Sequence, residues 1–206
     1  MTEDLTDIPE AKSLVDTIKR SIRTSDNIGI DRCIQCGVCT SSCPATRFTD
    51  YNPREVVKRV IENDHSIIKD DIIWSCFYCY SCNMRCPRNN SPSQVVQVLK
   101  QLAIKDSIGL DKIEVLFEYA DTFAEQGISK IPDPYVDQME EDFGKFWLEF
   151  RDNLDSMRRN LGLGDIGVKD GGRNEIHQIL EGVRFYDRLE KLKRDADKMS
   201  SQKDRK

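Results

Sequence analysis

The sequence predicts an all-α protein, and three observations support this class. Apolar residues recur at steps of three and four in segments on both sides of a cysteine-rich region, which is the period of an amphipathic helix. Each of two cysteine clusters is followed by a helix-capping residue and then a proline, which is the pattern at the start of many helices. Neither of these segments shows the alternation of apolar and polar residues that is typical of β-strands.

Composition limits the classes of protein that the chain can represent. Its 206 residues are 38% hydrophobic and 33% charged, which suits one medium domain or two small ones with a thin core. The net charge of −5 gives no reason to expect nucleic-acid binding. No apolar run reaches the roughly 18 residues of a membrane-spanning helix, and the acidic start MTEDLTDIPE lacks a signal-peptide pattern. We therefore expect a cytoplasmic protein that binds neither nucleic acid nor membrane.

All eight cysteines lie in two short clusters with the same C-x2-C-x2-C-x3-C spacing, each followed at once by a proline. A secreted disulfide scaffold is usually shorter and spreads its cysteines over the fold. Two short segments with four thiols each instead favour metal binding. The first cluster consists of Cys33, Cys36, Cys39 and Cys43, and the second of Cys76, Cys79, Cys82 and Cys86.

The spacing predicts two 4Fe-4S clusters. A cubane cluster takes four thiolates, and in two-cluster ferredoxins with this run the fourth cysteine binds the other cluster. Structural zinc is the alternative, but zinc needs only two C-x2-C pairs per ion and gives the middle cysteines no role. The ligands of cluster 1 are then expected to be Cys33, Cys36, Cys39 and Cys86, and those of cluster 2 Cys43, Cys76, Cys79 and Cys82.

The helices expected around these motifs form a repeat. A lead-in helix over residues 8–23 belongs to an N-terminal segment, 1–27. After each motif, Asn52-Pro53-Arg54-Glu55 and Ser91-Pro92-Ser93-Gln94 have the pattern of a capping box with proline at the first helical position. The repeated unit of cysteine loop and capped helix predicts an alpha-helical ferredoxin module over residues 28–106. The apolar faces expected of these three helices contain Leu14, Val15, Ile18 and Ile22, then Val56, Val57, Val60 and Ile61, then Val95, Val96, Leu99, Leu102 and Ala103.

Residues 107–206 are expected to form a helical C-terminal region that docks a partner. We predict helices over 110–126, ending at Gly127, over 137–161, and from Glu175, with a frayed tail over 191–206. The aromatic stripe of 137–161 is interpreted as core, whereas the acidic excess in 107–150 predicts a solvated face or a surface that steers a partner. The glycines of 162–167 match G-x-G-x-x-G but follow a helix, so they are interpreted as a linker.

Several side chains beside the cysteines are candidates for tuning or shielding the clusters. Gly37 leaves room for backbone amides near cluster sulfurs, and Tyr80 occupies the matching place in the second motif. The two histidines, His65 and His177, lack the spacing of a ligand set. Aromatic residues that could shield cluster 2 are Trp74, Phe77, Tyr78 and Tyr80, and arginines that could favour a reduced cluster are Arg32, Arg47, Arg85 and Arg88.

The stretches CIQCGVCTSSCPATR, NPREVV and IIWSCFYCYSCNMRCPRNNSPSQVV closely resemble the C-type subunit of the methanogen-type heterodisulfide reductase, over residues 28–105. This resemblance implies an iron–sulfur subunit that relays electrons from a flavin-containing A-type subunit to a catalytic B-type subunit, which reduces the CoM-S-S-CoB heterodisulfide in methanogenesis. It also implies, through these two proteins, a hydrogenase or formate dehydrogenase as partner. The same helical module occurs in succinate dehydrogenase and in glycolate-oxidase-like proteins.

The chain itself is not expected to catalyse the reaction. It contains no Cys-Cys pair of the kind found in the CCG motifs of the catalytic B-type subunit, no ninth cysteine and no evident flavin-binding signature. We therefore expect an oxidoreductase subunit without catalytic residues, inactive alone. Two alternatives stay open: the relay subunit of a related sulfur-oxidising, glycolate oxidase or fumarate reductase type of enzyme, and a zinc-stabilised interaction protein.

Overall fold

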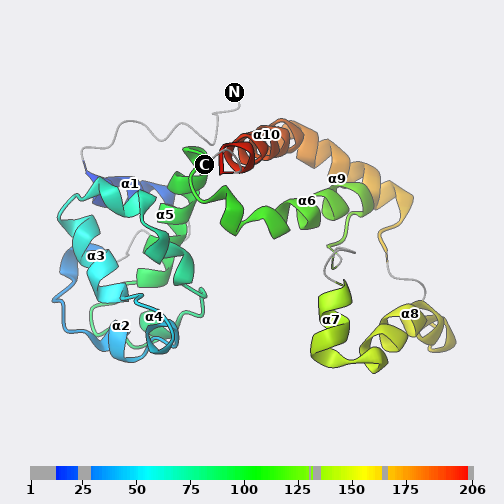
Figure 1. Cartoon of the computed structure of the whole chain (residues 1–206), viewed down its shortest axis with the longest axis horizontal. Coiled ribbons are helices and arrows are strands. Elements are labelled where there is room, and N and C mark those ends of the chain that lie inside the picture. Colours follow the sequence, from blue (N-terminus) through cyan, green and yellow to red (C-terminus); the bar gives the residue numbers. More distant parts are fainter. Residues whose placement is uncertain (1–12, 23–28, 130, 132–135, 164–166, 204–206) are drawn as a thin grey trace. The chain divides into compact units, whose positions relative to one another are not determined.

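The computed structural model describes residues 13–22, 29–129, 131, 136–163 and 167–203 (Figure 1). Every regular element in these ranges is an α-helix or a 3₁₀ turn, which confirms the all-α class. No helix within the described ranges is both long and apolar enough to cross a membrane. The chain divides into two compact units, Met1–Gly109 (unit 1) and Leu110–Lys206 (unit 2).

Unit 1 is organised around α5, which packs against α1, α3 and α4. Figure 1 shows the short helices α2 and α4 side by side, at the end of the unit away from α1. The bounds of the helices are α1 Leu14–Ser21, α2 Val38–Ser41, α3 Pro53–Ile61, α4 Ser81–Met84 and α5 Pro92–Lys105. The 3₁₀ turns are Gly29–Arg32, Ala45–Arg47, His65–Lys69 and Asp71–Ser75. Fully buried side chains in the core of this unit include Leu14, Ile18, Ile30, Val56, Val57, Val60, Ile67, Ile73, Val95 and Leu99.

The lead-in helix α1 packs through the expected apolar face in the part that the structure describes. Leu14 and Ile18 are buried, and the Ser13 hydroxyl caps the helix by accepting from the Asp16 N–H. The N–H of Leu14 also donates to Asn63 Oδ1 at 2.7 Å, which ties the start of α1 to the loop after α3. The parts of the expected helix before residue 13 and after residue 22 lie outside the described residues.

The two helices that follow the cysteine motifs begin in different ways. Asn52 caps α3, because its Oδ1 accepts from the N–H groups of Arg54 and Glu55. The same device was expected at Ser91, and this prediction is wrong. The Ser91 hydroxyl makes no capping bond and lies 3.3 Å from the Ser93 hydroxyl. Both serines are buried, so their hydroxyls pair with each other instead of with the first turn of α5.

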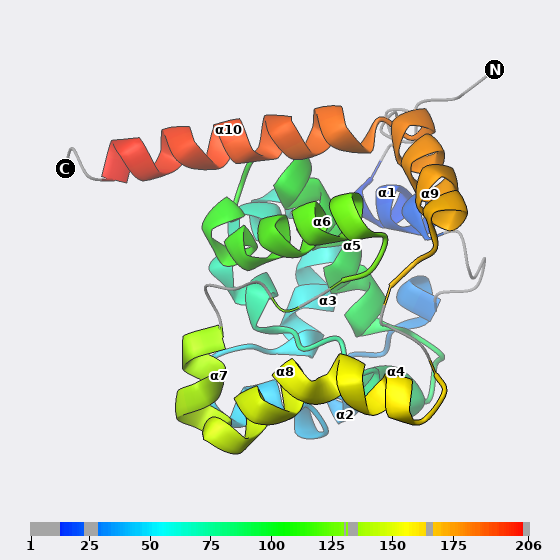
Figure 2. The ribbon, with the colours of Figure 1, turned by 90° about the vertical axis from the view of Figure 1, so that its right-hand side faces the viewer.

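Unit 2 contains the 3₁₀ turn Leu110–Lys112, α6 Glu114–Gln126, α7 Val136–Phe143, α8 Lys145–Asn160, α9 Asp170–Gly182 and α10 Phe185–Lys203. Figure 2 shows α6, α9 and α10 close together, and α6 packs against both of the others. Gly127 ends α6 in the left-handed conformation, as expected from its position. The tail was expected to fray from residue 191, but α10 continues to Lys203. Lys193 stabilises it by donating to Asp121 Oδ1 of α6 at 2.6 Å.

Three further expectations for unit 2 are wrong. The single helix expected over 137–161 is two helices, because Gly144 adopts a φ of 79° between α7 and α8. Its aromatic stripe is not core, since Phe143, Phe146 and Phe150 are 62%, 78% and 45% exposed. The helix expected from Glu175 already begins at Asp170 and is interrupted near Arg184, which has a φ of 54°.

Candidate iron–sulfur sites

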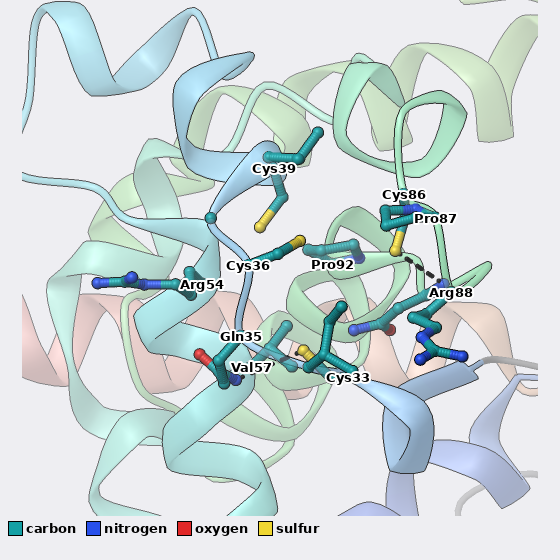
Figure 3. Close-up of a pocket in the computed structure, with 14 residues that line it drawn as sticks. Cys33, Gln35, Cys36, Cys39, Arg54, Val57, Cys86, Pro87, Arg88 and Pro92 are labelled. Atoms are coloured by element: carbon teal, nitrogen blue, oxygen red, sulfur yellow. Dashed lines mark hydrogen bonds between the residues drawn. The ribbon is translucent and has the colours of Figure 1, made fainter.

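The eight cysteines are free thiols that surround two hollows in unit 1. Hollow 1 is lined by Cys33, Cys36, Cys39 and Cys86, and Figure 3 shows their side chains gathered around the same space. Hollow 2 is lined by Cys43, Cys76, Cys79 and Cys82. Each hollow therefore combines three thiols from one cysteine motif with the fourth thiol of the other motif.

The two cysteine loops have the same backbone conformation at matching positions. Gln35 and Gly37 have φ values of 54° and 80° in the first loop, and Tyr78 and Tyr80 have values of 56° and 61° in the second. A short helix then starts directly after Gly37 and after Tyr80. Glycine adopts this left-handed conformation freely, whereas tyrosine adopts it at a steric cost. The second loop keeps this strain, which is a common feature of functional sites.

Hydrogen-bond donors reach the sulfur atoms of hollow 1 from the loop and from the segment before α5. Gln35 Nε2 donates to Cys33 Sγ at 3.5 Å, and the N–H of Asn90 donates to Cys86 Sγ at 3.3 Å. Burial raises the pKa of the Cys39 thiol, although hydrogen bonds with Thr40 oppose this shift. The hydrogen bonds from Gln35 and Asn90 stabilise the thiolate form of cysteine, which is the form that binds a metal.

Aromatic and hydroxyl side chains surround hollow 2. Phe77, Tyr78 and Tyr80 line it, and the ring centroids of the two tyrosines are 4.6 Å apart. A hydrogen bond with Tyr80, together with burial, raises the pKa of Tyr78 to about 12. Hydrogen bonds with the hydroxyl and N–H of Ser81 lower the pKa of Cys79. Burial raises the pKa of Cys82.

Not all of the expected neighbours lie at the hollows. Phe77, Tyr78 and Tyr80 do, but Trp74 instead packs beside Gly109 and below the Lys100 ammonium. Of the four arginines considered, only Arg88 lines a hollow. The two histidines line neither, and His177 Nδ1 lies 2.7 Å from the Tyr186 hydroxyl.

The residues at the hollows that the sequence reasoning missed include Arg54, Tyr51 and Asn90. Arg54 lines hollow 1, although Figure 3 shows its side chain extending away from the cysteines. Tyr51 lines hollow 2 and Asn90 lines hollow 1, and both are buried. The signal that could have identified the last two is their equivalent position in the repeat, immediately before Asn52-Pro53 and Ser91-Pro92.

The residues around each hollow fit a 4Fe-4S cluster. Such a cluster needs four thiolates on different sides, apolar surroundings and donors to its sulfur atoms. Hollow 1 supplies four thiols and apolar walls from Ile34, Val57 and Pro92. Hollow 2 supplies four thiols and the aromatic rings described above. Which thiols bind which cluster stays a prediction.

Comparisons with known proteins agree with this chemistry. A family described as "4Fe-4S dicluster domain" matches residues 29–90. The C-type subunit of the ferredoxin:CoB-CoM heterodisulfide reductase of Methanosarcina acetivorans is 48% identical over 187 residues, which are 91% of this chain and 75% of the relative. The chain belongs to the family of C-type heterodisulfide reductase subunits.

Other members of this family match over shorter lengths. The C2 subunit of the H(2)/formate:CoB-CoM heterodisulfide,ferredoxin reductase of Methanococcus maripaludis is 39% identical over 71 residues, 34% of this chain and 39% of the relative. The C-type subunit of the H(2):CoB-CoM heterodisulfide,ferredoxin reductase of Methanothermobacter marburgensis is 36% identical over 85 residues, 41% of this chain and 46% of the relative. The chain thus belongs to a family of proteins that are iron–sulfur subunits of oxidoreductases.

Proposed function

We propose that this chain relays electrons within a cytoplasmic heterodisulfide reductase complex. The chain would hold two 4Fe-4S clusters through its cysteines, and these would supply one-electron transfer from a flavin-containing A-type subunit to a catalytic B-type subunit, which reduces the CoM-S-S-CoB heterodisulfide. The observation that carries this proposal is the pair of four-thiol hollows built jointly from both cysteine loops. Because both cysteine loops contribute ligands to both clusters, the two clusters must lie next to each other. This arrangement suits electron transfer between a donor and an acceptor protein.

The proposed ligands follow the grouping of the thiols. Cys33, Cys36, Cys39 and Cys86 hold cluster 1, and Cys43, Cys76, Cys79 and Cys82 hold cluster 2. Each cluster, when bound, accepts and releases one electron. The protein holds the thiolates, donates hydrogen bonds to sulfur, and limits water at hollow 2 with aromatic rings. With all eight thiols in use, none is left to exchange with a disulfide substrate, so the chain carries no catalytic residue.

Unit 2 is proposed to dock the catalytic B-type subunit. The support comes from α8, in which Phe146 and Phe150 present large apolar side chains to solvent at a spacing of one helical turn. Contiguous exposed aromatic side chains are typical of protein interaction sites. A large redox partner also needs more contact area than the short cysteine loops offer.

Ferredoxin is the proposed source of electrons for the complex. In the name of the relative that aligns with 91% of this chain, ferredoxin stands before CoB-CoM heterodisulfide. In the names of the two shorter matches above, H2 stands in that place, in one of them with formate, and ferredoxin follows the heterodisulfide. The hydrogenase or formate dehydrogenase that the resemblance implied is the alternative donor. Reduction of the reconstituted complex by each donor in turn separates the two.

The relay is tested by reconstitution from purified proteins under anaerobic conditions. We expect dithionite to reduce the isolated chain, which shows no heterodisulfide reductase activity until the catalytic B-type subunit is added. The double variant Phe146→Asp/Phe150→Asp should keep both clusters but weaken binding of that partner. Ser156→Asp, which also adds charge to an exposed position of α8, is the matched control. Turnover by the chain alone, or unchanged binding by the double variant, would contradict this division of roles.

A further inference from the structure

Tyr51 and Asn90 occupy equivalent positions in the internal repeat of unit 1. Tyr51 precedes Asn52-Pro53 at the start of α3, and Asn90 precedes Ser91-Pro92 at the start of α5. Both residues are only 2% exposed. They line opposite hollows, since Tyr51 contributes to hollow 2 and Asn90 to hollow 1. This position of the repeat therefore places a buried polar side chain in each hollow.

The Tyr51 side chain lines hollow 2 together with the four thiols Cys43, Cys76, Cys79 and Cys82. Its hydroxyl is hydrogen-bonded with Cys76. A phenol O–H group beside a thiolate donates to its sulfur.

The side-chain amide of Asn90 has an unused polar atom. Its Oδ1 is buried without a hydrogen-bond partner, while its backbone N–H donates to Cys86 Sγ at 3.3 Å. The oxygen and nitrogen of an amide exchange places by a simple rotation. The amide then presents N–H donors, which a cluster sulfur accepts. Buried polar side chains normally have a hydrogen-bond partner. The Asn90 amide would have one if a cluster bound in hollow 1 accepted its hydrogen bond.

We propose that Tyr51 and Asn90 are matched positioning residues, each of which hydrogen-bonds to sulfur of the cluster in its own hollow and raises that cluster's reduction potential. This inference rests on the proposed binding of a 4Fe-4S cluster in each hollow.

The physical basis is the negative charge that a cluster gains on reduction. One electron enters the cluster, no covalent bond forms or breaks, and the hydroxyl proton remains on the Tyr51 oxygen. A donor hydrogen bond to sulfur stabilises the reduced state more than the oxidised state. Burial strengthens this effect, because the interaction is not screened by water. Exposed Arg54 has less influence, since its side chain extends away from the cysteines (Figure 3).

The test is an anaerobic redox titration of the full chain, followed by electron paramagnetic resonance and combined with an iron count. In Tyr51→Phe we expect one midpoint potential to fall by about 59 mV. This shift corresponds to about a tenfold change in the ratio of oxidised to reduced cluster at a fixed potential. Asn90→Leu should lower the other midpoint. Tyr186→Phe is the matched control, because the Tyr186 hydroxyl bonds to His177 in unit 2 and Tyr186 lines neither hollow, and it should move neither midpoint.

Three results would overturn the inference. Both midpoints could stay unchanged in a fully loaded Tyr51→Phe protein, or the Tyr51 and Asn90 variants could move the same midpoint. Loss of a cluster in Tyr51→Phe would instead give the hydroxyl a role in assembly. A wild-type chain without iron–sulfur clusters would refute the proposed function itself, so the two failures are distinguishable.

Discussion

Replacing Asn52 with alanine should destabilise unit 1 measurably, because one side-chain oxygen makes three contacts. Asn52 Oδ1 accepts from the N–H groups of Arg54 at 3.1 Å and Glu55 at 3.2 Å, and from the Thr40 hydroxyl at 2.7 Å. Loss of an N-cap costs about 1 kcal/mol, and loss of a neutral hydrogen bond costs about 1 kcal/mol more. We therefore expect the free energy of unfolding to fall by about 2 kcal/mol.

The assay is anaerobic thermal unfolding of the cluster-loaded chain, followed by far-ultraviolet circular dichroism. A domain of the size of unit 1 changes its Tm by about 4 °C per kcal/mol, so Asn52→Ala should lower Tm by about 8 °C. Ser91→Ala is the matched control, because Ser91 occupies the equivalent position but makes no capping bond. It should lose at most one weak hydrogen bond, or about 4 °C. Equal decreases in the two variants would refute this reasoning, since the sequence pattern alone treats the two positions alike.

Three further predictions concern unit 1. Cys86→Ser should disrupt the cluster bound by the first motif and Cys43→Ser that of the second, as seen by electron paramagnetic resonance; disruption of each motif's own cluster would show that the ligands do not cross. Gly109→Ala should destabilise the fold by about 2 kcal/mol, because Gly109 has a φ of 71° and an added Cβ would lie 2.5 Å from the Trp74 ring; an unchanged Tm would contradict this packing. Arg59→Met should lower the free energy of unfolding by about 1 kcal/mol, because Arg59 donates to Asp64 at 2.7 Å and Asp70 at 2.6 Å. This decrease should be smaller at high salt, and a decrease independent of salt would contradict an electrostatic role.

The parts of the fold that depend on local signals could be predicted from the sequence. Proline and Asn52 at the start of α3, and apolar residues at helical steps, identify α3 and α5 because capping and amphipathicity act within a few residues. The break at Gly144 could not be predicted, because the aromatic stripe keeps its helical spacing across the glycine. The length of α10 depends on the distant partner of Lys193, which a polar composition does not reveal.

The same distinction applies to the candidate sites. Cysteine spacing is a local signal, and it predicts the four thiols that line each hollow. Adjacency to a cysteine, however, does not bring Arg47 or Arg85 to a hollow, because neighbouring side chains can point to opposite sides. The repeat places Tyr51 and Asn90 at equivalent positions of the sequence, but their burial beside the hollows depends on packing and is seen only in the structure.

An anaerobic determination of iron, acid-labile sulfide and zinc in the purified full chain tests the central claim most directly. Two cubane clusters, each held by four of the eight thiols, require about eight irons and about eight sulfides per chain and no stoichiometric zinc. A value of about four irons, or one or more zinc ions in place of iron, would contradict the two-cluster relay.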